Sequence, residues 1–368
     1  MKIIILTLSL ELGGSERRAI TLARYFKRRG ADVELWGFNG PGTLSQICDE
    51  FNIPWKVIPF SWYQGSQKRL ADLFRLLNAL RNARPDILLP HTLLPNMACG
   101  LVWRWSGAKK CIGYEGGHEI GLIDRRWEAL AVKQIPLLIC NAQHIADEMM
   151  HSFHLRKNKI EIIRNGVELD EAIHPRAWWR ANLGVDEKAF LATMVANLSG
   201  FKDHETLIRA WRLVLDQSKS RDRDARLLLV GKNFGTELML KNLVSVLGIQ
   251  DSVLFLGHVQ DVSGLLQSVD IGVYSSRREG CPNGVLECMR AGLAIAAADA
   301  EGIREVVGEH QYPWLSSLED TDQFAKNILS LKEDAGLRKK VGDCNRERVM
   351  REYSPEQMCE ATEKLIAG

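Results

Sequence analysis

The chain has 368 residues, which is too long for one ordinary domain and suits two domains of about 150–200 residues each. Hydrophobic residues make up 46% of the sequence, so each half has enough apolar side chains to bury a core. The net charge is only +2, which argues against nucleic-acid binding. No stretch reaches about 18 consecutive apolar residues, so the sequence predicts no membrane-spanning helix.

The charge is unevenly distributed along the chain. Residues 1–170 contain 23 Lys and Arg against 17 Asp and Glu, a net charge of +6, whereas residues 171–368 have a net charge of −4. A basic first half would favour an anionic acceptor or an anionic membrane surface. An ordinary imbalance of surface charge explains the same numbers, and the sequence leaves both interpretations open.

Eight cysteines are scattered along the sequence, and no two of them have CxxC spacing. This distribution predicts reduced thiols in a cytoplasmic protein, because a disulfide framework or a zinc site would need closer grouping. The opening MKIIILTLSLELGG has one basic residue, no small-residue cleavage site and the acidic Glu11. It therefore predicts a first β-strand and not a signal peptide.

Short apolar runs alternate with helical segments, of which 16–29 and 66–81 are the clearest. This alternation predicts parallel sheets whose strands are joined by crossover helices. The strands predicted in the first half are 3–9, 32–38, 55–58, 86–90, 110–114, 137–140 and 160–163. Those predicted in the second half are 190–196, 226–230, 253–256, 271–274 and 294–298.

The alternating pattern lapses at 168–175, before a new helix begins near Arg176. We therefore predict an α/β fold with two Rossmann-like domains, residues 1–170 and 171–354, whose parallel sheets face each other across a cleft. Ligands of such sheets bind at the carboxyl ends of the strands. A last helix is expected over 355–368, after the break marked by Pro355.

The most informative segment is 275–306, SSRREGCPNGVLECMRAGLAIAAADAEGIREV. Glu279 follows a buried strand, and Glu287 lies on the next helix, for which Asn283 is the expected N-cap. Carboxylates accept hydrogen bonds from hydroxyl groups, and a helix N-terminus attracts anions. The segment therefore predicts a site for a ligand with sugar hydroxyls and a phosphate; the alternative is a strand–helix unit with two solvated glutamates.

The context EGCPNGVLECMRAG, followed by EGIREVV, resembles the donor site of retaining, nucleotide-sugar-dependent glycosyltransferases of family 4. The resemblance extends over nearly the whole chain. It implies the GT-B fold, in which the helix at 355–368 crosses back to the first domain. The donor-binding residues that it implies are Gly13, Gly14, Asn197, Lys202, Lys232, Val259, Glu279, Gly280, Cys281, Pro282, Asn283, Gly284 and Glu287.

The resemblance also implies catalytic roles for His118, Glu279 and Lys202. His118, in a glycine-rich loop, would attend the transferred sugar, and Lys202 would neutralise the departing diphosphate. Asn197 stands where the family usually has Arg, so a neighbouring cation or helix-terminal N–H groups would have to compensate. The candidate acceptor-binding residues are His91, Trp62 and Tyr63.

No metal site is predicted. The DxD strings 222–224 and 320–322 lie in polar linkers and not at the carboxyl end of a strand. Helix N-termini and Lys202 can supply the positive charge that a metal ion would otherwise provide. We expect no cofactor, since the nucleotide-diphosphate sugar is a co-substrate.

The predicted function is transfer of a sugar from a nucleotide-diphosphate donor to a hydroxyl of a saccharide or lipid-linked acceptor, in polysaccharide, lipopolysaccharide or glycolipid biosynthesis. The predicted location is the cytoplasm, including the inner face of the cytoplasmic membrane through peripheral contact, and no nucleic acid is expected as a partner. The alternatives are a GT-B sugar-nucleotide epimerase or phosphorylase, or a non-catalytic nucleotide-sugar-binding protein.

Overall fold

The computed structural model describes residues 1–63, 65–117, 124–218 and 224–368. The chain divides into two compact units, one of Met1–Gly166 with Pro355–Gly368 and the other of Val167–Ser354. The first unit ends at Gly166 and not at residue 170, because the Val167 N–H already donates to the Tyr353 carbonyl, 2.9 Å away, within the second unit. No helix in the described ranges is both long and apolar enough to cross a membrane.

The first unit is a seven-stranded parallel sheet with strand order β3-β2-β1-β4-β5-β6-β7. Its strands are β1 (Lys2–Thr7), β2 (Asp32–Gly37), β3 (Trp55–Val57), β4 (Ile87–Pro90), β5 (Lys110–Glu115), β6 (Leu137–Cys140) and β7 (Ile160–Ile162). Its helices are α1 (Gly14–Arg28), α2 (Thr43–Glu50), α3 (Ser66–Ala83), α4 (Leu93–Ser106), α5 (Arg125–Gln134), α6 (Gln143–Phe153), η1 (Lys157–Lys159) and α15 (Pro355–Ala367).

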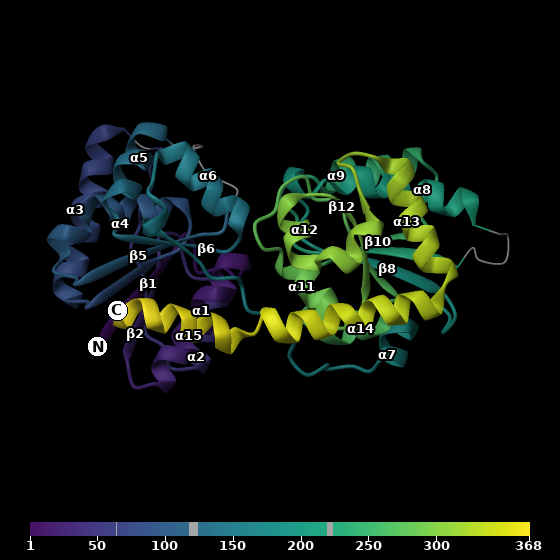
Figure 1. Ribbon diagram of the computed structural model, residues 1–368, viewed down its shortest axis with the longest axis horizontal. Coiled ribbons are helices and arrows are strands. Elements are labelled where there is room, and N and C mark those ends of the chain that lie inside the picture. Colours follow the sequence, from purple (N-terminus) through teal and green to yellow (C-terminus); the bar gives the residue numbers. More distant parts are fainter. Residues whose placement is uncertain (64, 118–123, 219–223) are drawn as a thin grey trace. The chain divides into compact units, whose positions relative to one another are not determined.

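Helices cover both faces of this sheet, because alternate side chains of each strand point to opposite faces. Ile4 and Leu6 of β1 belong to a core with α3, α4, α5 and α6, whereas Ile3 and Ile5 belong to a core with α1, α2 and α15. Figure 1 shows these two helix layers on opposite sides of the sheet.

Helix α15 is part of the first unit, the position that the family resemblance implies. The Tyr25 hydroxyl of α1 donates to Glu363 at 2.8 Å, and the Lys110 amine of β5 donates to the Ile366 carbonyl at 2.8 Å. Met358, Cys359 and Ile366 are buried in the core beneath α1. These contacts bind the last helix to the first sheet.

The second unit is a six-stranded parallel sheet with strand order β10-β9-β8-β11-β12-β13. Its strands are β8 (Phe190–Val195), β9 (Ala225–Val230), β10 (Val253–Gly257), β11 (Ile271–Tyr274), β12 (Ala294–Ala298) and β13 (Leu315–Ser316). Its helices are α7 (Arg176–Asn182), η2 (Gly200–Lys202), α8 (His204–Gln217), α9 (Glu237–Val246), α10 (Val262–Ser268), α11 (Asn283–Arg290), α12 (Glu301–Val307), η3 (Glu309–Trp314), α13 (Thr321–Glu333) and α14 (Ala335–Glu352).

All twelve predicted strands are present in the structure, and β13 is the strand that the sequence did not predict. Its two residues are too few to form a periodic pattern. Each unit therefore has the predicted Rossmann-like α/β fold. In each sheet the strand order reverses beside the first strand, between β1 and β4 and between β8 and β11. Loops diverge at such a reversal, and ligands bind in the resulting crevice.

The packing of α15 can be tested with Met358→Ala, which removes a side chain that is 3% exposed. We expect the free energy of unfolding of the first unit to fall by about 2–5 kcal/mol, because the change removes buried apolar contacts and leaves a cavity. Thermal unfolding should show a transition several degrees lower. Glu360→Ala, an exposed change on the same helix, is the control; equal transitions for both variants would contradict the packing described here.

Candidate active site

The second unit brings together two of the residues predicted to be catalytic. Lys202 lies in the loop after β8 and Glu279 in the loop after β11, the two strands that flank the reversal of strand order. The Lys202 amine donates to a Glu279 carboxylate oxygen in an ion pair. The Glu279 side chain is only 4% exposed, so this lysine balances the charge of a buried carboxylate.

Three further contacts fix the two loops to each other. The Ser275 hydroxyl donates to the Lys202 carbonyl at 3.0 Å, and the Arg277 N–H donates to the Phe201 carbonyl at 3.0 Å. The Arg277 guanidinium also donates to Asp203, which caps α8, at 3.1 Å. Lys202 is therefore held in place by its backbone as well as by its side chain, the kind of preorganisation that electrostatic catalysis requires.

Helix α11 begins one residue earlier than expected. Pro282 is the N-cap, and its carbonyl accepts the first helical hydrogen bond from Leu286 at 3.1 Å. The prediction that Asn283 is the N-cap is wrong, because Asn283 is already the first helical residue. The Pro282 side chain provides no capping hydrogen bond to this helix. Its first turn therefore has the electrostatic character of an anion site.

Two glycines allow the backbone around this turn to pack closely. A Cβ on Gly284 would lie 2.1 Å from the Val195 carbonyl oxygen of β8, and a Cβ on Gly302 would lie 2.1 Å from the Gly280 carbonyl oxygen. Both clashes would be with backbone atoms, which cannot rotate away. The glycines of PNG and EGIREVV are therefore explained by the approach of α11 and α12 to the loop that contains Glu279.

Glu287 lies on α11 and is 7% exposed, so the segment contributes a second buried carboxylate. The thiol of its neighbour Cys288 and the Tyr274 hydroxyl are in hydrogen-bonding contact at 3.2 Å. Burial raises the pKa of Cys288 to about 12. This thiol is therefore neutral and is no candidate nucleophile.

Asn197 has a structural role that the sequence did not reveal. Its side-chain carbonyl accepts a hydrogen bond from the Lys232 N–H at 3.0 Å, and the Leu198 N–H donates to the Lys232 carbonyl at 2.9 Å. Asn197 thus joins the loop after β8 to the loop after β9. Val259 follows β10, the edge strand, and is partly buried against the core of the unit.

His204, at the start of α8, is a residue that the sequence analysis missed. It is 2% exposed, and neither ring nitrogen has a hydrogen-bond partner among the residues described. Burial, with a smaller contribution from the neighbouring Lys202 charge, lowers its pKa to about 4. The imidazole is therefore neutral and adds no charge beside the Lys202–Glu279 pair.

The remaining predicted residues belong to the first unit. Gly13 is the N-cap of α1 in the loop after β1, and His91 directly follows β4, the strand beside β1 at the reversal of strand order. His91 is 2% exposed, and its Nδ1 contacts the Leu89 carbonyl at 3.0 Å. Burial and the nearby Arg18 charge lower its pKa to about 3.

The two aromatic candidates for acceptor binding differ in their exposure to solvent. Tyr63 is 78% exposed, whereas Trp62 is 5% exposed and packs against Trp127, with the Arg69 guanidinium over its ring. The Trp62 indole is therefore part of the core, and of these two candidates only Tyr63 has most of its side chain exposed. His118 lies outside the described residues.

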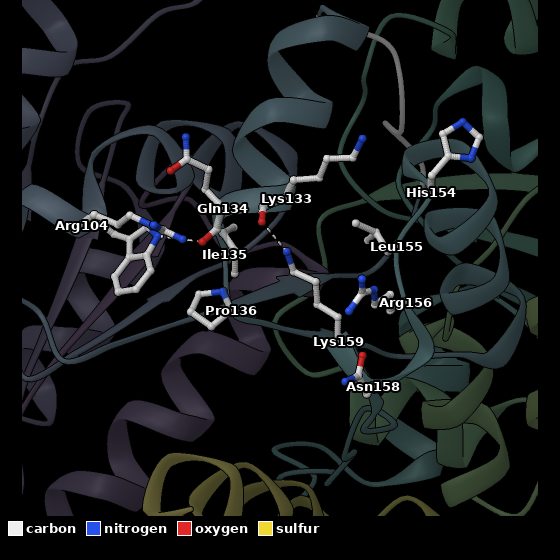
Figure 2. A pocket seen from close by; sticks show the side chains of 11 residues that line it. Arg104, Lys133, Gln134, Ile135, Pro136, His154, Leu155, Arg156, Asn158 and Lys159 are labelled. Atoms are coloured by element: carbon white, nitrogen blue, oxygen red, sulfur yellow. Dashed lines mark hydrogen bonds between the residues drawn. The ribbon is translucent and has the colours of Figure 1, made fainter.

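The described ranges contain no cluster of three or more His, Cys, Asp or Glu suited to hold a metal ion. Asp320 caps α13 by accepting from the Gln323 N–H at 2.9 Å. A pocket of about 460 Å³ lies elsewhere, in the first unit between Arg104 and Lys159, and none of the predicted site residues lines it (Figure 2).

The fold and the site define a GT-B glycosyltransferase, and comparison with known proteins agrees. Residues 176–348 match the family described as Glycosyl transferases group 1, and residues 12–171 match Glycosyltransferase Family 4. The chain therefore belongs to the group 1 glycosyltransferases of family 4, and its enzymatic class is glycosyltransferase.

Two distant relatives and one solved structure match this chain over most of their own length. EpsD of Bacillus subtilis (strain 168), a protein named as a glycosyltransferase, is 26% identical over 89% of this chain and 87% of its own. The UDP-Gal:alpha-D-GlcNAc-diphosphoundecaprenol alpha-1,3-galactosyltransferase of Escherichia coli is 22% identical over 73% of this chain and 72% of its own. The structure of Anabaena Alr3699/HepE in complex with UDP and glucose superposes with a TM-score of 0.86 at 20% identity, covering 100% of this chain and 99% of HepE.

The buried His204 predicts a pH dependence of stability. Its folded pKa of about 4 lies below the ordinary value of 6.5, so the unfolded chain binds more protons between these two pH values. The stability is therefore fully present above about pH 6.5 and is lost as the pH falls toward 4, by about 2 kcal/mol at pH 5.

We expect His204→Leu to lose less stability between pH 7 and pH 5 than the native protein in urea unfolding. The exposed His151→Leu serves as the control and should behave like the native protein. If His204→Leu and the native protein lost the same free energy over this range, a neutral buried imidazole would be ruled out.

Proposed function

We propose that this glycosyltransferase transfers a sugar, with retention of anomeric configuration and without a metal ion, from a nucleotide-diphosphate sugar to a hydroxyl acceptor. The observation that supports the proposal most strongly is the ion pair between Lys202 and the buried Glu279 at the reversal of strand order. A cation and a carboxylate fixed side by side suit a ligand that combines a diphosphate with sugar hydroxyls.

Each donor group then has a partner in the second unit. Glu287 would accept hydrogen bonds from the nucleotide ribose, while Glu279 and the N–H groups of 280–284 would bind the sugar hydroxyls. Lys202 would move from Glu279 to the diphosphate as the donor binds. Because the Lys202 backbone is already fixed by Ser275, only the side chain would have to reorient.

Because Asn197 is uncharged, another group would have to stabilise the departing diphosphate in place of the usual Arg. Arg277 is a poor substitute for the missing Arg, because its guanidinium already contacts Asp203 at 3.1 Å and Glu319 at 3.2 Å. Lys232 is the better candidate, since Asn197 binds its backbone N–H directly. The lysines and the N-terminal end of α11 would together supply the positive charge that replaces a metal ion.

In the family that this chain resembles, the leaving phosphate accepts the proton of the acceptor hydroxyl. The bond between the anomeric carbon and the phosphate oxygen breaks, and the acceptor oxygen attacks on the same face of the sugar. This route requires no carboxylate base, which leaves Glu279 free to bind the sugar. Preorganised donors around the diphosphate would lower the barrier most, because negative charge develops there.

The acceptor and the donor base are inferred from the relatives. The Escherichia coli enzyme acts, by its name, on a diphosphoundecaprenol-linked sugar, and HepE was solved with UDP-glucose. We therefore propose a saccharide or lipid-linked acceptor, a UDP-sugar as the first donor to test, and action at the inner face of the cytoplasmic membrane.

Donor binding can be tested with Glu287→Ala. A ligand at a hundred times its dissociation constant adds about 2.7 kcal/mol of stability, so a suitable UDP-sugar should raise the unfolding temperature of the native protein by several degrees. The same sugar should leave Glu287→Ala nearly unshifted, because the ribose contact is lost. Glu333→Ala, an exposed change in the same unit, should keep the native shift; a full shift in Glu287→Ala would refute the assignment of Glu287.

Turnover can be tested with Lys202→Met. Loss of a preorganised charge at the leaving group should lower kcat by about 10²–10³-fold, while the exposed Lys188→Met should stay near native. The assay follows labelled sugar into the acceptor, and NMR of the product reports its anomeric configuration. Donor binding without transfer would favour a nucleotide-sugar-binding protein, and donor isomerisation or phosphate dependence would favour an epimerase or a phosphorylase.

A further inference from the structure

Three of the four helices in one layer of the first unit have an unusual distribution of charge, whereas the fourth, α6, contains two acidic residues. Helices α3 and α5 both pack on α4, over the sheet face that contains Ile4 and Leu6. The three helices contain eight Lys and Arg but only two Asp and Glu. Both acidic side chains, Asp72 and Glu128, are buried at 7% and 0% exposure. The charged side chains that these helices expose are therefore all basic.

The same helices expose large apolar side chains. Leu70 and Phe74 lie one turn apart on α3 and are 57% and 63% exposed. Trp105 at the end of α4 is 58% exposed, and Trp127 and Leu130 on α5 are each 45% exposed. Apolar side chains among Lys and Arg are typical of surfaces that lie on a membrane, where Trp favours the level of the headgroups.

A basic pocket opens where α4 and α5 end. Four cations line it, Arg104, Lys133, Arg156 and Lys159, and no carboxylate does (Figure 2). The Lys159 amine donates to the Lys133 carbonyl at 2.6 Å, so the C-terminal end of α5 explains the position of this one cation. The negative C-terminal ends of two helices attract positive charge, but four cations are more than two helix ends require. A phosphate group would balance the positive charge that is left.

We propose that this face, made by α3, α4 and α5 and called here the basic–aromatic face, docks on an anionic phospholipid surface and that the pocket receives a lipid phosphate. The exposed apolar side chains enter the headgroup region while the cations contact anionic lipids. This inference rests on the proposed function, because membrane docking would bring the enzyme to a lipid-linked acceptor.

A second copy of the chain fits this face less well than a membrane does. In a twofold dimer the same patch meets itself, so the basic side chains of the two copies would oppose each other. An anionic lipid surface complements the charge and accepts the apolar side chains as well. The charge of the face therefore selects the membrane as the occupant.

The test uses the full chain with vesicles of phosphatidylcholine, alone or with phosphatidylglycerol, in a co-sedimentation assay. We expect binding to the anionic vesicles at low salt, little binding to neutral vesicles, and a steep fall as the ionic strength rises to about 0.5 M. The double variant Arg104→Gln/Lys133→Gln should weaken partitioning by about 30-fold, since it removes two cations near the lipid surface.

A second double variant, Phe74→Ser/Trp127→Ser, should weaken binding at every salt concentration, because it removes apolar contacts that salt does not screen. Matched changes in the second unit, Lys340→Gln/Arg346→Gln and Phe234→Ser/Leu238→Ser, should bind vesicles like the native protein; all four of these side chains are exposed. Unfolding temperatures near native establish that each variant is folded.

Three outcomes would overturn the proposal. One is a native protein that ignores anionic vesicles at low salt, and another is native-like binding by both variants of the basic–aromatic face. The third is a native protein that does not bind vesicles but uses Arg104 and Lys133 in another way. It would then either bind soluble glycerol phosphate or self-associate in sedimentation. Vesicle binding is measured without turnover, so an inactive protein that still binds anionic vesicles would refute the proposed function and leave this inference intact.

Discussion

The reversal of strand order beside the first strand is the constraint on which the functional organisation of both units depends. The loops after β8 and β11 belong to adjacent strands whose crossover helices run to opposite faces, so the loops diverge at the carboxyl edge and leave a crevice. Lys202 and Glu279 are 77 residues apart in sequence and meet there because the two strands are neighbours. In the first unit, the loops with Gly13 and His91 follow the equivalent pair, β1 and β4.

The site is rigid mainly because of its backbone. Close packing of Gly284 and Gly302 against carbonyl oxygens sets the positions of α11 and α12, and hydrogen bonds to the Phe201 and Lys202 carbonyls fix the neighbouring loop. The charged side chains are thus attached to a frame that does not depend on them. In such a frame, a change in one side chain alters binding or chemistry more than it alters the fold.

The strands and the two-unit organisation could be predicted because buried parallel strands are continuous apolar runs, which are visible in one sequence. The pairing of Lys202 with Glu279 could be anticipated only from a family resemblance, since it depends on strand order. The burial of Trp62, the capping by Pro282 and the role of Asn197 could not be predicted. Trp62 and Asn197 depend on which distant segment packs nearby, Trp127 and Lys232 respectively, and the capping residue depends on where the turn before α11 ends. His204 was missed because no local pattern distinguishes a buried imidazole from an exposed one.

The contribution of α15 to the first unit has a consequence for the order of folding. The core that contains Ile3 and Ile5 also needs Met358, Cys359 and Ile366, which are synthesised after the entire second unit. Val167–Ser354 is continuous and can collapse on its own as it leaves the ribosome, since domains generally fold as units. The unit that begins the chain is therefore the one completed last, and until then the surface beneath α15 is open to solvent and to chaperones.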